Sequence, residues 1–300
     1  MRCLVTGGGG FIGGNLAKRL LDEGHEVTVT AMGGETIDPR AKVTYCGLRG
    51  IDRFATSDKD VVFHQAANND TLCQDEVEMM RINYEDSVYL LTRASEWGVK
   101  KFIYASSCAV YGSSPAPYVE GITEENPLNA YGRSKLRFDQ YDFFKRLPTD
   151  LRKNVIGLRY SNVYGPGEDH KGHRMSMIGQ MIRKVMKGQP IKLFKWGLQR
   201  RDWVYIDDVV NANMLAMQSD ASGIFNIGCG CAYKFIEVLS AIAKETYSVI
   251  EPEFIDCPFA DAYQDYTECC IEKAKAAFGY VPEYDLYQGI KKYLMALRNR

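Results

Sequence analysis

The chain has 300 residues, of which 46% are hydrophobic and 25% charged, and its net charge is −1. This composition is typical of a folded globular protein and excludes a disordered chain. A charge near zero, without a long basic run, gives no electrostatic reason to expect nucleic acid or an anionic membrane as partner, so we expect a small-molecule ligand. Residues 1–6 read as a strand leading into glycines, not as a secretory signal or a membrane span, and we expect a cytoplasmic protein.

Short apolar runs alternate with helical patterns in the first half of the chain. The pattern predicts, in order, a strand over 3–6, a helix over 11–21, strands over 26–30, 43–46 and 61–64, a helix over 76–97, a strand over 102–105, a helix over 131–144 and a strand over 155–159. Strands separated by helices imply right-handed crossovers and a parallel sheet covered on both faces. We therefore expect an α/β fold with a doubly wound Rossmann sheet, whose ligands lie beyond the carboxyl ends of the strands.

The regular alternation of predicted strands and helices ends after residue 165. A polar loop over 168–174 precedes a helix over 176–187 and a short strand over 191–194, which together predict a second, smaller lobe. A strand over 202–206 and a helix over 207–218 are expected to return to the first lobe. The predicted division is an NAD(P)-binding Rossmann domain, 1–165 plus 200–228, and a substrate-binding lobe formed mainly by 166–199 plus 229–300.

A glycine-rich loop, Gly7-x-x-Gly10-x-x-Gly13, joins the first strand to an apolar helix. Glycines in this context permit the tight turn, let the backbone approach a diphosphate and let helix and strand pack closely. Free N–H groups and the helix dipole then favour a phosphate at the helix N-terminus. We expect a nicotinamide dinucleotide here; the alternative is a glycine-rich turn without a ligand.

The identity of the dinucleotide stays open at this stage. Residues 30–34, at the end of the second strand, lack the carboxylate that holds the ribose hydroxyls of NAD, and the first acid is Glu35. No arginine replaces that acid directly. To select NADP, the side chain of Arg40 or Arg49 would have to reach the 2′-phosphate from elsewhere in the fold.

Tyrosine precedes lysine by four residues three times, at Tyr131/Lys135, Tyr141/Lys145 and Tyr287/Lys291. Only Tyr131 follows a strand that ends in a serine, Ser107. Tyr141 lies further along the same predicted helix, and Tyr287 belongs to an amphipathic segment over 287–297. Position therefore selects Tyr131, Lys135 and Ser107 as the catalytic set.

The chemistry of these three residue types suits hydride transfer at a secondary alcohol. A phenol has an ordinary pKa near 10, too high for a base at neutral pH, so we expect the Lys135 ammonium one helical turn away to lower the pKa of Tyr131. Lys135 is also expected to hydrogen-bond the nicotinamide ribose. Ser107 is expected to donate to the substrate oxygen and to orient Tyr131, which handles the hydroxyl proton.

The residues after Ser107 limit the reactions that the site can catalyse. Dehydratases built on this scaffold have an Asp-Glu pair there, and this chain has Cys108 and Ala109. Water elimination is therefore disfavoured. What remains is oxidation of the substrate followed by re-reduction. Re-reduction of the same molecule on its opposite face is epimerisation. Transfer of the hydride to or from a different molecule is dehydrogenation or reduction.

Metal chemistry has little support in the sequence. Nine cysteines and four histidines are scattered along the chain. The pairs Cys229/Cys231 and Cys269/Cys270 have the wrong spacing for a zinc site or a redox dithiol. We expect reduced, structural thiols and no metal.

Several motifs together resemble those of the extended short-chain dehydrogenases/reductases that act on nucleotide sugars. In the first lobe these are the glycine loop, Tyr104-Ala-Ser-Ser107, Val110-Tyr-Gly112, Pro127-Leu-Asn129, Tyr131-x-x-x-Lys135 and Arg159-Tyr-x-Asn162-Val-Tyr-Gly-Pro166. Further motifs are most similar to the ADP-glyceromanno-heptose 6-epimerase family: Glu168-Asp-His-Lys171-Gly172, Leu193-Phe194, Arg201-Asp-Trp-Val-Tyr205, Ser222-Gly-Ile-Phe-Asn-Ile-Gly228 and Tyr263-Gln-x-x-Thr267.

The resemblance implies a nucleotide-diphosphate sugar substrate, one tightly bound NAD(P) per subunit and a homo-oligomer. Family likeness favours NADP, and NAD stays open. The implied coenzyme contacts are Gly7, Gly10, Phe11, Ile12, Gly13, Leu48, Ala66, Ala67, Asn83, Tyr131 and Lys135. The implied substrate contacts are Ser107, Asn162, Lys171, Phe194, Arg201 and Tyr263.

By the same resemblance, Lys171 is a second acid/base that faces the sugar opposite Tyr131. Inverting a carbinol carbon requires protons to be managed on two sides, which gives this role a chemical reason. Two simpler interpretations stay open: Lys171 as an exposed lysine of a polar loop, and Phe194 as a core residue.

Three other functions compete with a heptose-type epimerase. A UDP-hexose 4-epimerase would use Tyr131 alone, with Lys171 incidental. A nucleotide-sugar dehydrogenase or reductase would release a keto-sugar. A non-catalytic dinucleotide sensor would need the glycines and not Tyr131, Lys135 and Ser107, all of which are present.

Overall fold

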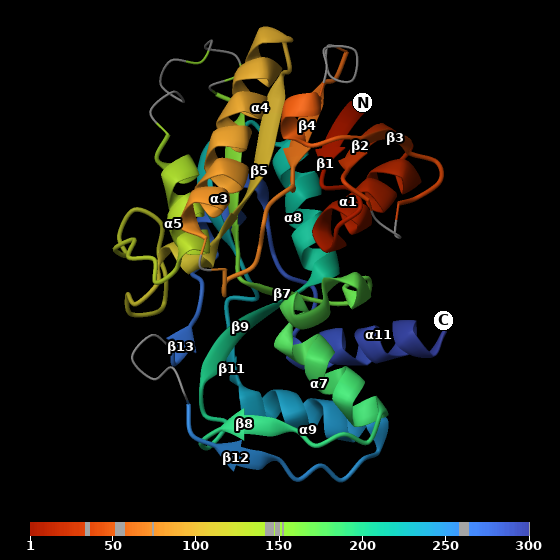
Figure 1. Cartoon of the computed structure of the whole chain (residues 1–300), viewed down its shortest axis with the longest axis vertical. Helices are drawn as coiled ribbons and strands as arrows, with labels where there is room; N and C mark the ends of the chain where they lie inside the picture. Colours follow the sequence, from red (N-terminus) through yellow and green to blue (C-terminus); the bar gives the residue numbers. More distant parts are fainter. Residues whose placement is uncertain are drawn as a thin grey trace.

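The structure is a computed structural model that describes residues 1–33, 37–51, 58–73, 75–141, 147, 151, 153–257 and 264–299. Two lobes share an extensive core: the largest buried cluster runs from Val5 and Leu16 in the first lobe to Ile182, Ile242 and Leu294 in the second. Figure 1 shows the first lobe above and the smaller lobe below. In the described part of the chain, no helix is both long and apolar enough to cross a membrane.

The first lobe is built on a parallel sheet of seven described strands (Figure 1). Their spatial order is β10 (Gly223–Ile227), β6 (Val155–Tyr160), β5 (Lys101–Ser107), β4 (Val61–His64), β1 (Arg2–Thr6), β2 (Glu26–Ala31) and β3 (Lys42–Tyr45). Each neighbouring pair is parallel. The strand order reverses between β1 and β4, and such a reversal opens a crevice at the carboxyl edge of the sheet. The predicted doubly wound sheet is confirmed.

Helices cover both faces of this sheet. Helices α1 (Phe11–Asp22) and α8 (Ile206–Gln218) pack together, and α4 (Asp86–Glu96) and α5 (Ala130–Asp139) lie on the opposite side in Figure 1. Because both faces are covered, a central strand such as β1 is buried along almost its whole length, from Cys3 to Thr6. This explains why the strands read as continuous apolar runs.

Two predicted helices differ in detail from the observed ones. The helix expected over 76–97 is interrupted: α3 (Glu76–Met80) passes through a π-helical turn, Arg81–Glu85, into α4. The helix expected over 131–144 ends at Asp139, so Tyr141 does not continue it. Residues 142–146 lie outside the described residues.

In the part of the chain that the structure describes, the smaller lobe contains two short sheets and three helices. Strand β9 (Arg200–Tyr205) pairs with β7 (Asn162–Tyr164), β11 (Ala232–Lys234) and β13 (Tyr266–Thr267), and β8 (Lys192–Phe194) pairs with β12 (Glu253–Ile255). Helices α7 (Met177–Met186), α9 (Phe235–Thr246) and α11 (Leu286–Arg298) pack beside them.

The segment predicted to return to the first lobe contributes to both sheets. Strand β9 pairs within the sheet of the smaller lobe, whereas α8 and β10 pack with the first lobe. Helix α10 (Glu272–Phe278) also packs against β10 of the first lobe, although most of the C-terminal region belongs to the smaller one. The apolar pattern predicts strands but not which sheet each strand joins, so the pairing of β9 is visible only in the structure.

Candidate active site

The glycine loop lies at the crevice between β1 and β4. Gly7 has a φ of +69°, and a Cβ on it would lie 2.8 Å from the Cα of Ala66, which follows β4. Only glycine fits this close approach without strain. Gly10 caps α1 without any side-chain hydrogen bond, so the first N–H groups of the helix face the crevice unblocked. This geometry fits a dinucleotide phosphate.

Two cavities meet above this loop. The larger, of about 730 Å³, reaches from Gly7 and Gly10 to residues 30–33 at the end of β2 and to Leu48 and Ala66. The smaller, of about 370 Å³, is lined by the glycine loop with Phe11, Ile12 and Gly13 and by the predicted catalytic residues. A path from the end of β2 to the catalytic residues suits a dinucleotide with its adenosine in the larger cavity and its nicotinamide in the smaller.

Ser107, Tyr131 and Lys135 all line the smaller cavity. Ser107 ends β5, and Tyr131 lies in the first turn of α5, whose N-cap Asn129 accepts a 2.8 Å hydrogen bond from the Gly132 amide. A Cβ on Gly132 would lie 2.7 Å from the carbonyl oxygen of Ala109. The lack of a side chain at Gly132 therefore lets α5 press against the turn after Ser107. The structure thus brings together the three residues that the sequence selected.

The pKa of Tyr131 differs from our expectation that Lys135 lowers it. Burial raises the pKa of Tyr131, and the hydrogen bond with Ser107 opposes that shift. Burial also lowers the pKa of Lys135 to about 8, against the attraction of Asp139. Lys135 Nζ donates to the Ala105 carbonyl at 2.8 Å and lies 5.9 Å from the centre of the Tyr131 ring. In this structure the Tyr131–Ser107 hydrogen bond, and not Lys135, favours the phenolate.

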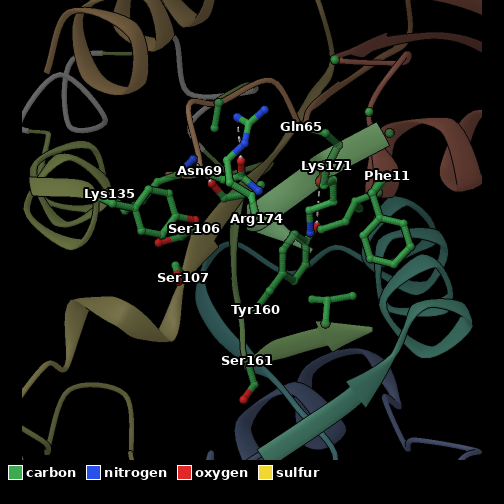
Figure 2. Close-up of a pocket in the computed structure, with 18 of the residues that line it drawn as sticks. Phe11, Gln65, Asn69, Ser106, Ser107, Lys135, Tyr160, Ser161, Lys171 and Arg174 are labelled. Carbon is green, nitrogen blue, oxygen red and sulfur yellow. Dashed lines mark hydrogen bonds between the residues drawn. The ribbon is translucent and has the colours of Figure 1, made fainter. Parts of the chain in front are cut away.

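Lys171 enters the smaller cavity from the other side. Figure 2 shows Lys171 and Phe11 on one side of the cavity and Lys135 on the other. The Lys171 side chain is only 14% exposed; its Nζ lies 3.8 Å from the buried Glu168 carboxylate and 5.1 Å from the Phe11 ring centre. Burial lowers the pKa of Lys171, and Glu168 opposes that shift. Lys171 is therefore not the freely exposed lysine of the simpler interpretation.

A buried charged network lies behind β5 and α5, which carry the predicted catalytic residues. Asp139, at the end of α5, accepts hydrogen bonds from Tyr104 at 3.0 Å, Ser106 at 2.9 Å and Arg159 at 2.8 Å. Arg159 also donates to Tyr111 at 2.9 Å and pairs with Glu125. Burial raises the pKa of Asp139, and Arg159 is the main group that opposes this shift. The network ties β5, β6 and α5 together.

A second set of hydrogen bonds fixes the loop after β4. The Thr6 hydroxyl accepts from the Ala66 amide at 3.2 Å and pairs with His64 Nδ1 at 2.8 Å, while His64 Nε2 pairs with the Ser87 hydroxyl, also at 2.8 Å. Burial lowers the pKa of His64 to about 3, so the ring is neutral. It serves to hold the cavity wall in place.

Several predicted contacts do not lie where we expected. Asn83 is 1% exposed and lines neither cavity; it instead bonds the main chain of Asn68 at 2.8 Å and the Ser134 hydroxyl at 3.1 Å. Asn162 donates to the Asp202 carbonyl at 3.0 Å, and its neighbours Ser161 and Val163 line the smaller cavity in its place. Asn83 and Asn162 thus hold backbone next to the cavities.

The remaining predicted substrate contacts belong to the smaller lobe. Phe194, in β8, and Arg201, in β9, line neither of the two cavities. The Arg201 guanidinium lies 5.7 Å from the Phe235 ring centre and donates to the Arg200 carbonyl at 2.8 Å. Tyr263 lies outside the described residues.

Cys108 and Ala109 are also absent from both cavity walls. The Cys108 thiol points away, toward Cys269 Sγ at 2.8 Å and the Arg159 carbonyl at 3.3 Å. No titratable pair therefore follows Ser107 in the cavity, as elimination would need. Among the described residues, no group of three or more His, Cys, Asp or Glu side chains is arranged to hold a metal.

Sequence reasoning missed several lining residues. Arg81 lines the larger cavity, Tyr160 the smaller, and Gln65, His170 and Arg174 line both. Arg40 and Arg49, the predicted candidates for an additional phosphate, line neither; each pairs with carboxylates. Gln65 and Tyr160 each directly follow a predicted strand, and that position was the available signal. Arg81, His170 and Arg174 lie in segments whose path depends on tertiary packing.

Comparison with known proteins agrees with this geometry. The model of the NAD dependent epimerase/dehydratase family matches residues 3–228. The chain is 35% identical to the ADP-L-glycero-D-manno-heptose-6-epimerase of Brachyspira hyodysenteriae (strain ATCC 49526 / WA1), over 98% of this chain and 97% of that protein.

Two solved structures show the same fold over almost their whole length. The ADP-L-glycero-D-manno-heptose-6-epimerase of Helicobacter pylori superposes with a TM-score of 0.88 at 33% identity, covering 100% of this chain and 96% of that one. The UDP-glucose 4-epimerase of Thermus thermophilus, in complex with NAD, superposes with a TM-score of 0.86 at 29% identity, covering 99% of each chain.

Proposed function

Because the chain belongs to the NAD dependent epimerase/dehydratase family, we propose that it is a nucleotide-sugar epimerase of the ADP-L-glycero-D-manno-heptose 6-epimerase type. The observation that carries the proposal is that Tyr131 and Lys171 line one cavity from two different lobes, beside the glycine loop. Inversion of a carbinol carbon needs proton transfer on both faces of the sugar, and this cavity offers a titratable group on each side.

The coenzyme supplies, when bound, the acceptor and then the donor of one hydride. Tyr131 removes the hydroxyl proton from the substrate carbinol, while Ser107 holds the same oxygen and stabilises the phenolate through its hydrogen bond. Lys135 anchors the coenzyme ribose. These groups account for oxidation to a ketone.

Re-reduction on the opposite face of the sugar requires the ketone to rotate within the cavity, so that its other face points toward the coenzyme. Lys171 then protonates the new alkoxide on its own side. Its lowered pKa suits this role, because an amine gives up its proton more readily as its pKa approaches the working pH. The hydride that leaves the sugar returns to it, so the cycle consumes no net reductant, and we expect the coenzyme to stay bound from one turnover to the next.

The substrate is tested directly by a screen of nucleotide sugars. Purified protein is incubated with ADP-, GDP- and UDP-sugars without added coenzyme, and proton NMR follows the stereochemistry at each carbon. We expect inversion at carbon six of an ADP-heptose. Turnover of UDP-hexoses alone would contradict the heptose assignment.

A UDP-hexose 4-epimerase is the second candidate, because the match to the Thermus UDP-glucose 4-epimerase spans 99% of both chains. In that function Tyr131 acts alone and Lys171 has no role in proton transfer. The same screen separates the two candidates, since it reports which carbon is inverted. It also detects a released keto-sugar, the product of a dehydrogenase.

For the coenzyme, we propose NADP in preference to NAD. Among the described residues at the end of β2, 30–33, none carries a carboxylate for the ribose hydroxyls. Asp86 lines the larger cavity, but Arg49 Nε at 2.5 Å and Arg81 at 3.6 Å neutralise it, and Arg81 itself lines the cavity. Titration with NADPH and NADH tests the preference: the protein should bind NADPH more tightly, and the reverse order would contradict it.

A further inference from the structure

The junction of the two cavities carries one charged side chain from outside the glycine loop. Six residues line both cavities: Gly7, Gly10, Gln65, Ala67, His170 and Arg174. In a dinucleotide that spans both cavities, the diphosphate lies at this junction, over Gly10 and the N-terminus of α1. Of the six, only Arg174 carries a permanent positive charge.

Arg174 belongs to a segment that crosses from the smaller lobe to the first. This segment is the 3₁₀ turn Asp169–Arg174, which also contains Lys171. Arg174 Nη1 donates to Asn69 Oδ1 at 3.4 Å, and His173 Nε2 lies 3.3 Å from Asp70 Oδ2. Asn69 and Asp70 follow β4 in the first lobe. The turn is therefore a strap that reaches over the glycine loop and touches the opposite wall.

Hydrogen bonds hold both the base of the strap and the wall that it touches. On the side of the smaller lobe, the buried Glu168 accepts hydrogen bonds from the Ser176 amide and hydroxyl, both at 2.7 Å. On the opposite wall, Asn83 pins Asn68, the residue before Asn69, with two 2.8 Å hydrogen bonds. Figure 2 shows Arg174 beside Asn69, between Lys135 on one side and Lys171 on the other.

Most N–H donors of the Arg174 guanidinium make no hydrogen bond to a side chain in the described part of the structure. Guanidinium offers five N–H donors, and in the part of the chain that the structure describes it makes one side-chain hydrogen bond, at the long distance of 3.4 Å. Two diphosphate oxygens would be better partners, because Arg–phosphate hydrogen bonds are charge-assisted and often bidentate. Exchanging one weak bond for such a pair costs little.

We propose that Arg174 binds the diphosphate of the nicotinamide dinucleotide from above, opposite the N-terminus of α1, and that it sets the rate at which the coenzyme leaves. This inference rests on the proposed function only in that the chain binds such a dinucleotide. The glycine loop supplies backbone donors below the diphosphate, and Arg174 supplies charge above it. The strap that carries Lys171 to the sugar thus also retains the coenzyme.

The test is the release rate of NADPH from the loaded protein, followed by the loss of energy transfer from protein aromatics after mixing with excess NADP. We expect Arg174→Met to release NADPH at least about tenfold faster, as for the loss of a charge-assisted hydrogen bond. Arg174→Lys, which keeps the charge, should recover most of the wild-type rate. Arg298→Met, at the far end of α11, removes the same charge away from the cavities and should change nothing.

The dependence of the release rate on ionic strength is a second measurement. It would not change if Arg174 had only a structural role. Salt should accelerate NADPH release from the wild type and have less effect on Arg174→Met, because the screened interaction is then missing. Equal release rates and equal salt dependence in wild type and Arg174→Met would overturn the inference and leave the proposed function standing. A wild type that binds neither NADPH nor NADH would overturn both.

Discussion

Arg159 Nε donates a 2.8 Å hydrogen bond to Asp139 Oδ2, and both side chains are buried behind the cavity wall that carries the proposed catalytic groups. Arg159 lies opposite Ser106 in the β5–β6 register, next to Ser107, and Asp139 lies one helical turn beyond Lys135. This ion pair therefore links the strand that presents Ser107 to the helix that presents Tyr131. We therefore expect the relative position of Ser107 and Tyr131 to depend on it.

Asp139→Asn should lower the free energy of unfolding by about 3 kcal/mol or more, because it leaves the Arg159 charge buried with a weakened partner. Urea unfolding measures the change. Asp22→Asn is the matched control: Asp22 pairs with Lys18 and Arg40 at the surface, and its loss should have no measurable effect. Equal stability of the two variants would show that the buried pair does not hold the fold together.

Lys135→Met should abolish turnover and yet stabilise the coenzyme-free protein at pH 7. Burial moves the pKa of Lys135 from 10.5 to about 8, so keeping it charged at pH 7 costs the folded state up to about 3 kcal/mol. Methionine retains the apolar stem without the charge. Thermal unfolding and activity are measured on the same preparations.

The sign of this effect can be checked against pH. Between pH 8 and 10.5 the unfolded state binds more protons at Lys135 than the folded state, so the wild type gains stability as pH rises through this window. The stability advantage of Lys135→Met should therefore shrink over the same range. An advantage that does not change with pH would contradict the burial of a charged lysine.

Lys171→Met should reduce the epimerisation of ADP-heptose by at least about a hundredfold, the usual contribution of a positioned acid/base. Oxidation through Tyr131 should persist, and it is detected in a single turnover as reduction of bound NADP to NADPH. Lys187→Met, on the exposed turn after α7, is the control. Full epimerase activity in Lys171→Met would mean that Tyr131 acts alone, as in the 4-epimerase alternative.

Much of the site could be predicted because sheet topology brings strand ends together. Ser107 ends β5, and Gly7 and Ala66 follow the adjacent strands β1 and β4, so their meeting at one edge follows from the strand order. The Tyr131 spacing required only the start of α5. These positions depend on local pattern and on a fold whose handedness is fixed by general rules.

The rest depended on tertiary packing that the pattern does not encode. Arg174 reaches the cavities because the strap crosses between lobes, and Arg81 because a π-helical turn follows α3. Asn162 turns toward β9 because β7 pairs with that strand. The raised pKa of Tyr131 follows from burial, and the spacing of tyrosine and lysine carries no information about burial.

The central claim is that the Tyr131 hydroxyl exchanges a proton with the substrate carbinol. Its most direct test is Tyr131→Phe, which removes that hydroxyl and keeps the ring, assayed by proton NMR with ADP-heptose and no added coenzyme. We expect epimerisation to fall by at least about a hundredfold, with thermal unfolding and NADPH binding unchanged. Inversion at the wild-type rate by this variant would contradict the account.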